Sequence, residues 1–104
     1  MKMYRISSVE PVRYPVLSVT FDDELTGEID LTDEIRAGSI FAPLVDEALF
    51  RSVGIARSGR SIGWNLDEAG KEIDLGADGL RIDIETQQVQ HMAERYRRQR
   101  TAAE

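Results

Sequence analysis

Residues 14–31 read Tyr14-Pro-Val-Leu-Ser-Val-Thr-Phe-Asp-Asp-Glu-Leu-Thr-Gly-Glu-Ile-Asp-Leu31, and this stretch has the pattern of a β-hairpin. In its first half, Leu17, Val19 and Phe21 alternate with polar residues, so one strand face is apolar. The second half alternates in the same way after a polar turn formed by residues 22–24. Alternation with a period of two on both sides of a polar turn predicts two paired antiparallel strands.

The composition is that of one small folded domain. The chain has 104 residues, of which 41% are hydrophobic, and this suits a single modest core. It has no cysteine, which excludes disulfides, cysteine-ligated zinc and a thiol nucleophile. There is no apolar run of about 18 residues and no apolar signal segment at the start, so we expect neither a transmembrane helix nor a signal peptide. A cytoplasmic location is the default expectation.

The charge is distributed unevenly along the chain. The formal net charge is -6, yet Arg95, Arg97, Arg98 and Arg100 all fall within the last ten positions. The part before them is therefore more acidic than the average, and an acidic surface repels phosphate backbones. Broad nucleic-acid binding by the main domain is thus disfavoured, and the arginine cluster is the place where charge favours an anionic partner.

The segments that flank the hairpin predict short elements around the same core. Residues 4–10 alternate moderately and read as a first strand. Pro11 and Pro15 follow, and they mark either a break or an edge position, because proline cannot donate to a strand ladder. After the hairpin, Thr32 is placed to cap a short helical turn that Gly38 ends.

The second half of the chain predicts a helix, a second hairpin, a final strand and a longer helix. Asp46 precedes residues 47–53 as an N-cap, and the apolar residues of that segment have helical spacing. The dipeptide Ser58-Gly59 separates two short apolar segments, as in a hairpin, and residues 72–75 read as a strand. From about Ile82 the periodicity becomes helical.

These elements together predict an α+β fold. We expect a small, mostly antiparallel sheet of four to five strands with a short helix and a longer C-terminal helix. Residues 1–84 would form a compact α+β domain, and residues 85–104 would form a C-terminal amphipathic helix with a basic tail, as part of the same unit.

The C-terminal helix carries an apolar stripe. Val89, Met92, Ala93 and Tyr96 are three or four residues apart, so they share one helix face. An amphipathic helix has to bury such a stripe, and a small core makes two solutions credible. The helix packs either on its own sheet or on a second copy of the chain.

Short motifs follow one another along the chain. They are Val9-Glu-Pro11, Leu-x-Val-x-Phe-Asp-Asp from Leu17, Gly-x-x-Asp-Leu from Gly27, Phe-x-x-Leu-x-Asp-x-x-x-Phe from Phe41, and Trp64 with the later Asp74 and Leu80. Their order over roughly residues 6–82 resembles a small bacterial family, domain of unknown function 2442. The resemblance implies a small α+β domain and no particular activity. Some members are fused to a helix-turn-helix, and some are encoded beside toxin–antitoxin-like partners.

The chain departs from that family in its hairpin turn. Members usually have Asp-Gly there, whereas this chain has Asp22-Asp23-Glu24. The segment that follows Trp64 also looks longer than in many members.

No set of residues has the spacing of a catalytic, cofactor or metal site. Residues 22–24 with Glu28 lack the alternating ligands and glycine pivot of a calcium loop, so they read as a solvated turn. His91, the single histidine, lies off the apolar stripe and reads as a surface residue. The serines lie in no nucleophile-elbow motif. We therefore expect no enzyme activity, no cofactor and no metal.

Two groups of residues are candidates for contact with a partner besides the stripe. Trp64, with Arg57 and Arg60 across the predicted turn, is either an interface anchor or a core tryptophan covered by its own chain. The arginine cluster of residues 95–100 either contacts phosphate or solubilises the end of a helix.

The sequence thus favours a non-enzymatic interaction or regulatory module. We expect it to work as a homodimer or with a small protein partner, with no membrane involved. The contact would bury the stripe of Val89, Met92 and Tyr96, with Trp64 and its neighbouring arginines as anchors. The alternative is accessory nucleic-acid binding through Arg95, Arg97, Arg98 and Arg100.

Overall fold

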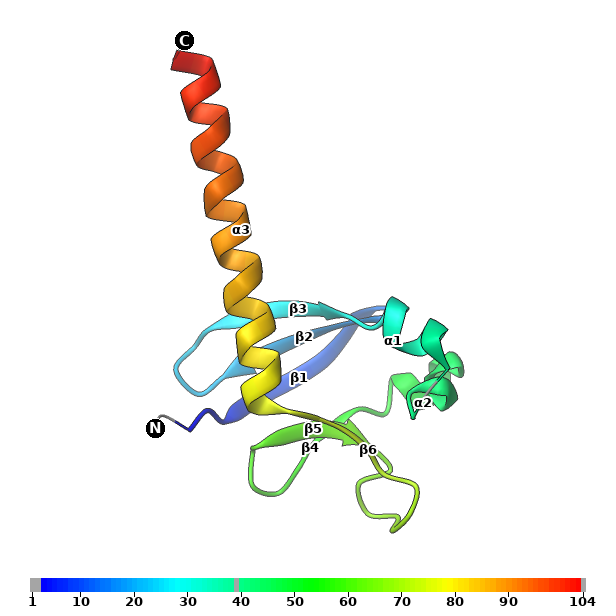
Figure 1. The fold of residues 1–104 in the computed structure, drawn as a ribbon. Coiled ribbons are helices and arrows are strands. Elements are labelled where there is room, and N and C mark those ends of the chain that lie inside the picture. Colours follow the sequence, from blue (N-terminus) through cyan, green and yellow to red (C-terminus); the bar gives the residue numbers. More distant parts are fainter. Residues whose placement is uncertain (1–2, 39, 104) are drawn as a thin grey trace.

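The computed structural model describes residues 3–38 and 40–103, with side chains up to Gln99. Two three-stranded antiparallel sheets face each other across one apolar core in an α+β fold (Figure 1). The first sheet has the strand order β1 (Ile6–Arg13), β2 (Val16–Phe21), β3 (Thr26–Asp30), and the second has the order β4 (Gly54–Ile55), β5 (Ser61–Trp64), β6 (Ile73–Gly76).

The helices lie at two places around the sheets. The short helices α1 (Thr32–Ala37), η1 (Ala42–Val45) and α2 (Glu47–Phe50) lie in the connection between the first and the second sheet, at one end of the body (Figure 1). The long helix α3 (Ala77–Ala103) follows β6 directly.

The α+β class is confirmed, but the predicted sheet of four to five strands is wrong. The described residues form six strands, and these are divided between two sheets. Alternation within a strand indicates which of its faces is buried, but it does not say which strands pair. Between the two sheets the Ile6 amide donates to the Gly59 carbonyl oxygen at 2.8 Å.

The predicted hairpin of residues 14–31 is confirmed as β2 and β3. Leu17 pairs with Ile29 and Val19 pairs with Gly27, and Leu17, Val19 and Phe21 are buried. In the turn, the Phe21 amide donates to the Leu25 carbonyl oxygen at 2.8 Å. The central strand β2 therefore supplies the apolar face on which the rest of the core packs.

Strands β1 and β3 form the two edges of this sheet. Pro11 lies within β1, opposite Leu17, so it takes the edge position that a proline without an amide hydrogen can occupy. Of the two interpretations of Pro11, the edge position is the one that the structure shows.

Two of the three predicted capping residues of the short helices are confirmed. Gly38 ends α1 in the left-handed region, and the Asp46 carboxylate accepts from the Ala48 amide at 3.0 Å. Thr32 is not a cap, because its amide and hydroxyl both donate to the Asp30 carboxylate, at 2.9 and 2.6 Å. These hydrogen bonds from Thr32, the hydroxyl above all, lower the pKa of Asp30 below its ordinary value.

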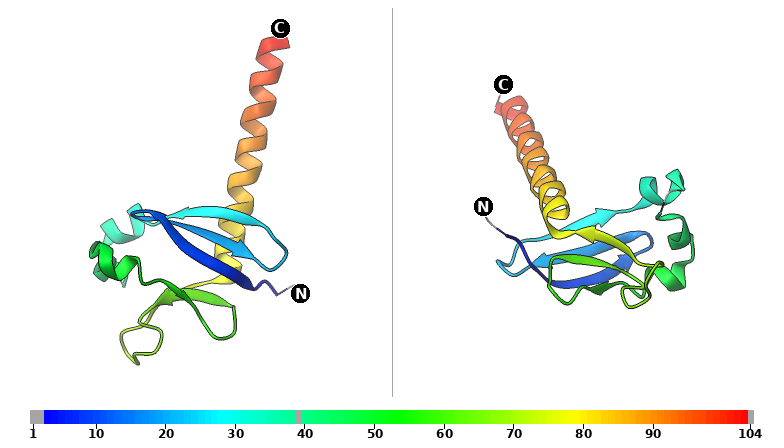
Figure 2. Two further views of the ribbon diagram at one scale, coloured as in Figure 1. Left: turned by 180° about the vertical axis from the view of Figure 1, so that it is seen from behind. Right: turned by 60° about the horizontal axis from the view of Figure 1, so that its bottom comes forward.

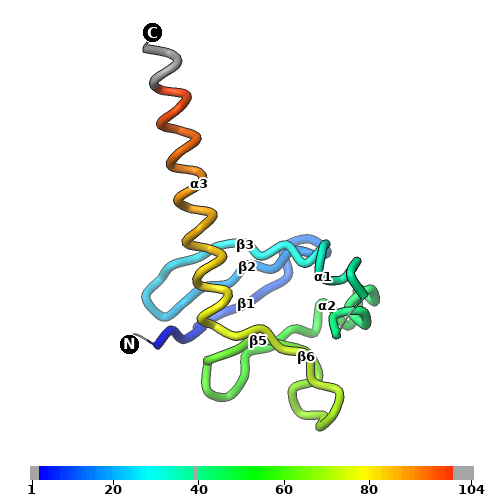
Figure 3. The backbone as a smooth tube through the Cα atoms, viewed as in Figure 1, coloured from blue at the N-terminus to red at the C-terminus, as the bar shows by residue number. Residues whose placement is uncertain are grey.

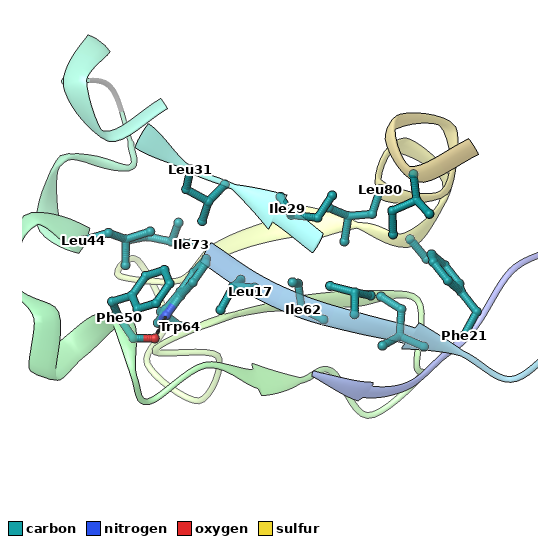
Figure 4. Packing of buried hydrophobic residues seen from close by; sticks show 14 residues of the cluster. Leu17, Phe21, Ile29, Leu31, Leu44, Phe50, Ile62, Trp64, Ile73 and Leu80 are labelled. Atoms are coloured by element: carbon teal, nitrogen blue, oxygen red, sulfur yellow. Dashed lines mark hydrogen bonds between the residues drawn. The ribbon is translucent and has the colours of Figure 1, made fainter. Parts of the chain in front are cut away.

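The core fills the space between the two sheets (Figure 4). Trp64, Phe21 and Phe50 are the largest side chains that are fully buried. Phe50 comes from α2 and Trp64 from β5, so the core ties the short helices to the second sheet. Their rings stack with centroids 6.2 Å apart.

Helix α3 leaves the body after its first turns. It projects from the sheets in every view, and no other element accompanies its outer half (Figures 1, 2 and 3). The radius of gyration is accordingly 15.9 Å, whereas a compact domain of this length has about 13 Å. The longest dimension of the molecule is 58 Å.

Candidate functional site

The first turns of α3 anchor the helix to the body. Ala77, Leu80 and Ile84 are buried, and the Ala77 amide donates to the Arg60 carbonyl oxygen at 2.8 Å. The helix therefore begins earlier than the predicted start near Ile82. Gly79 lies in its first turn, because the burial of Ala77 and Leu80 outweighs the low helix propensity of a single glycine.

Arg81 fastens this anchor to the hairpin turn. Its Nη1 donates to Asp23 Oδ1 at 2.8 Å, and its Nε donates to Glu85 Oε1 at 2.6 Å. The guanidinium also lies over the Tyr4 ring, 4.4 Å from the centroid. The hydrogen bond to Asp23, followed by that to Glu85, raises the pKa of Arg81 above its ordinary value, so the group stays charged.

We expect the substitution Arg81→Met to lower the free energy of unfolding by about 1–2 kcal/mol. The Arg81 side chain is 12% exposed, while its partners Asp23 and Glu85 are 35% and 50% exposed, so its charged hydrogen bonds are screened less than those of a fully exposed pair. Urea unfolding followed by Trp64 fluorescence measures the loss. The matched control is Arg51→Met, because Arg51 pairs with Glu47 where both side chains are more than half exposed. That variant should change the free energy by less than about 0.5 kcal/mol, and equal losses in both variants would contradict the prediction.

The outer half of α3 is exposed around nearly its whole circumference. Ala93 is half-buried, and the other side chains from Glu85 to Gln99 are exposed. Val89, Met92 and Tyr96 of the predicted stripe are 65%, 62% and 62% exposed. The stripe therefore does not pack on the protein's own sheets, which excludes the first of the two predicted solutions.

Ile82 extends this stripe and was missed in the sequence. It is 64% exposed, and it precedes Val89 by seven residues, as Val89 precedes Tyr96. We call Ile82, Val89, Met92 and Tyr96 the outer stripe. The seven-residue spacing could have indicated Ile82. From the sequence alone, however, an apolar residue at the expected start of the helix is taken for a core residue.

An open groove lies beside the outer stripe, between α3 and the edge strand β3. Thr26 and Gly27 line it from the strand, and Gln87, His91, Met92 and Arg95 line it from the helix, so Met92 belongs to both the groove and the outer stripe. Gln87 Nε2 donates to the carbonyl oxygen of Glu28 at 3.1 Å, so the helix partly covers the free edge of β3. His91 is exposed, as the sequence indicates.

The predicted arginine cluster lies toward the far end of α3. Arg95, Arg97 and Arg98 are exposed there. The side chain of Arg100 lies outside the part of the chain whose side chains are described. The helix holds these cations away from the acidic surface of the body.

Trp64 is not a surface anchor, so this part of the predicted interaction site is wrong. Its side chain is fully buried, and its Nε1 donates to the Phe50 carbonyl oxygen at 2.8 Å. Arg60 Nη2 instead pairs with Asp78 Oδ2 at 3.1 Å, while Arg57 is exposed. A small core needs the large apolar surface of the one tryptophan in the chain. Trp64 is therefore buried, apart from Arg57 and Arg60.

Within residues 3–38 and 40–103, no group of three or more His, Cys, Asp or Glu residues is arranged to hold a metal ion. None of the helices in that part of the chain has both the length and the apolarity needed to cross a bilayer. Comparison of the chain with family models, with curated proteins and with solved structures gives no match, so the resemblance to domain of unknown function 2442 stays a prediction.

Proposed function

We propose that the protein is a non-enzymatic interaction module that binds a protein partner through the outer stripe of α3. The observation that carries the proposal is the exposure of four large apolar side chains along one face of a projecting helix. Large apolar side chains grouped on a surface mark interaction sites more often than single ones do.

The weak support that the body gives to the outer part of α3 points to the same conclusion. An isolated helix of about 12–15 residues is marginally stable in water when nothing packs against it. Between Glu85 and Gln99 the body supplies few contacts, of which the hydrogen bond from Gln87 to β3 is one. A partner on the outer stripe would supply the missing apolar contacts and hold the stretch helical.

We expect a chain that ends at Ile84 to keep its fold. The removed side chains are almost all exposed, so the free energy of unfolding should fall by less than about 1 kcal/mol. Urea unfolding followed by Trp64 fluorescence, with the full chain as control, measures the change. A larger loss would show that residues 85–104 serve the fold, and the proposal would lose its basis.

A second candidate function is accessory nucleic-acid binding through the arginines at the far end of α3. Their exposure at a distance from the acidic body favours it. Such binding would weaken steeply with salt, because arginines that neutralise phosphates release counterions from the nucleic acid. The absence of salt-sensitive binding to duplex and single-stranded oligonucleotides would exclude this function.

A further inference from the structure

The spacing of the outer stripe is that of a helix pair. Ile82, Val89 and Tyr96 are seven residues apart, and Met92 follows Val89 by three residues. Ile82, Val89 and Tyr96 take the a positions of a heptad and Met92 takes a d position, while the d positions before and after it are Glu85 and Gln99. Side chains at a and d form the seam between two supercoiled helices. The seam indicates that the partner presents a helix.

Ile82, Val89 and Tyr96 of the outer stripe point away from the body, whereas Met92 lies about 80° around the helix from Ile84 and lines the groove beside β3. At 3.6 residues per turn, Ile82 lies about 200° around the helix from both Leu80 and Ile84, and these two residues are buried in the body. A second helix can therefore lie along the stripe without displacing the anchor of α3.

The charges of α3 are separated along its length. Asp78, Asp83 and Glu85 lie in its near half, where Arg81 is the one cation. Asp78 pairs with Arg60 and Glu85 pairs with Arg81 within the chain, so the half keeps a net negative charge. The cluster Arg95, Arg97 and Arg98 lies in its far half, where Glu94 is the one acid among the residues with described side chains. Two such helices attract each other when they run antiparallel, because each basic half then lies beside an acidic half, and repel when parallel.

We infer that the partner is a second copy of the chain and that the two α3 helices pair antiparallel about a two-fold axis between Val89 and Met92. This inference rests on the proposed function and names its partner. Val89 then faces the partner's Met92, and Met92 faces the partner's Val89. The stripe is thus complementary to itself, as a two-fold interface requires.

Each outer layer of this register joins an apolar residue to a polar one. Tyr96 faces the partner's Glu85, whose carboxylate can accept a hydrogen bond from the tyrosine hydroxyl. Ile82 faces the partner's Gln99. The net-positive far half of each helix then runs along the net-negative base of the other, with Arg95 and Arg97 about 100° from the centre of the stripe and Arg98 on the opposite side of the helix. The arrangement combines an apolar centre with charged ends, as interfaces commonly do.

Light scattering over a concentration series tests the dimer. We expect the full chain to reach twice its mass of 11.7 kDa and the chain ending at Ile84 to stay monomeric. Val89→Glu should shift the full chain to monomer. Gln90→Glu is the matched control, because it adds the same charge on a helix face about 115° from the centre of the stripe, and it should leave the dimer intact. A monomeric full chain, or a dimer that survives Val89→Glu, would overturn the inference.

Cysteine cross-linking tests the direction of the helices, since the natural chain has no cysteine. An oxidised mixture of Glu85→Cys and Tyr96→Cys chains should give the mixed disulfide. Tyr96→Cys alone should give little cross-linked dimer, because the two cysteines would lie about 16 Å apart along the axis, beyond the roughly 7 Å between Cα atoms that a disulfide spans. Efficient cross-linking of Tyr96→Cys alone would overturn the antiparallel arrangement.

The two proposals fail in different ways. If the chain ending at Ile84 unfolds, α3 is a structural element and the proposed function fails. If that chain stays folded but the full chain is a monomer at every concentration, the proposed function stands and the second copy is excluded as the partner.

Discussion

Replacement of Gly63 by alanine is expected to lower the free energy of unfolding by about 3 kcal/mol or more. Gly63 is buried in the central strand β5, opposite Asp74 of β6. A Cβ atom there would lie 2.2 Å from the carbonyl oxygen of Ile73 and 2.8 Å from Leu66 Cδ2. The first of these atoms belongs to the backbone, so relief of the overlap requires β5 and β6 to separate.

The matched control is Gly54→Ala, on the strand next to Gly63. Gly54 pairs with Gly63 across β4 and β5, but a Cβ atom at Gly54 would have no atom within 4 Å. This variant should be as stable as the natural chain, or more stable by up to about 1 kcal/mol, because alanine restricts the unfolded chain. Urea unfolding followed by Trp64 fluorescence compares the two. A loss below about 1 kcal/mol for Gly63→Ala would contradict the close approach of β5 to β6.

The substitution Trp64→Ala should cost about 3–5 kcal/mol. The indole is fully buried, stacks on Phe50 with a centroid distance of 6.2 Å, and donates to the Phe50 carbonyl oxygen. Phe50 in turn meets Tyr14 edge to face at 5.1 Å, so one cavity would loosen α2, β5 and the connection between β1 and β2. The free energy of unfolding of a whole domain of this size is only about 5–15 kcal/mol.

Two further variants serve as comparisons for Trp64→Ala. One tests the hydrogen bond of the indole, and the other tests the loss of an exposed aromatic ring. Trp64→Phe keeps a ring but removes the indole donor from the buried Phe50 carbonyl oxygen, which among the described residues then accepts only from the Val53 amide at 3.3 Å. This variant should cost about 1–3 kcal/mol. Tyr96→Ala removes an exposed ring and should change stability by less than about 0.5 kcal/mol. Unfolding is followed by circular dichroism, since the tryptophan signal is lost. If Trp64→Ala were no more destabilising than Tyr96→Ala, the buried position of Trp64 would be contradicted.

The core and the candidate site thus depend on different parts of the chain. Residues that hold the two sheets together, such as Gly63 and Trp64, control the free energy of unfolding. Residues of the outer stripe, such as Val89, are expected to control association with little effect on folding. Stability and association can therefore be measured on separate sets of variants.

The sequence by itself determined the elements whose signals are local. The hairpin of residues 14–31, the cap at Asp46 and the end of α1 at Gly38 follow from periodicity and from side chains that act on their own backbone. The apolar stripe of the C-terminal helix was visible for the same reason, because residues three, four and seven apart share a face wherever the helix lies.

Only the tertiary structure decided what each apolar face meets. It divided six strands into two sheets, placed Trp64 inside the core, and moved the start of α3 back to Ala77. It also brought Arg81 to Asp23 and left Val89, Met92 and Tyr96 in solvent. Periodicity shows that a face is apolar, but whether that face is buried or exposed depends on long-range packing. The candidate site of this protein is the apolar face that its own core leaves uncovered.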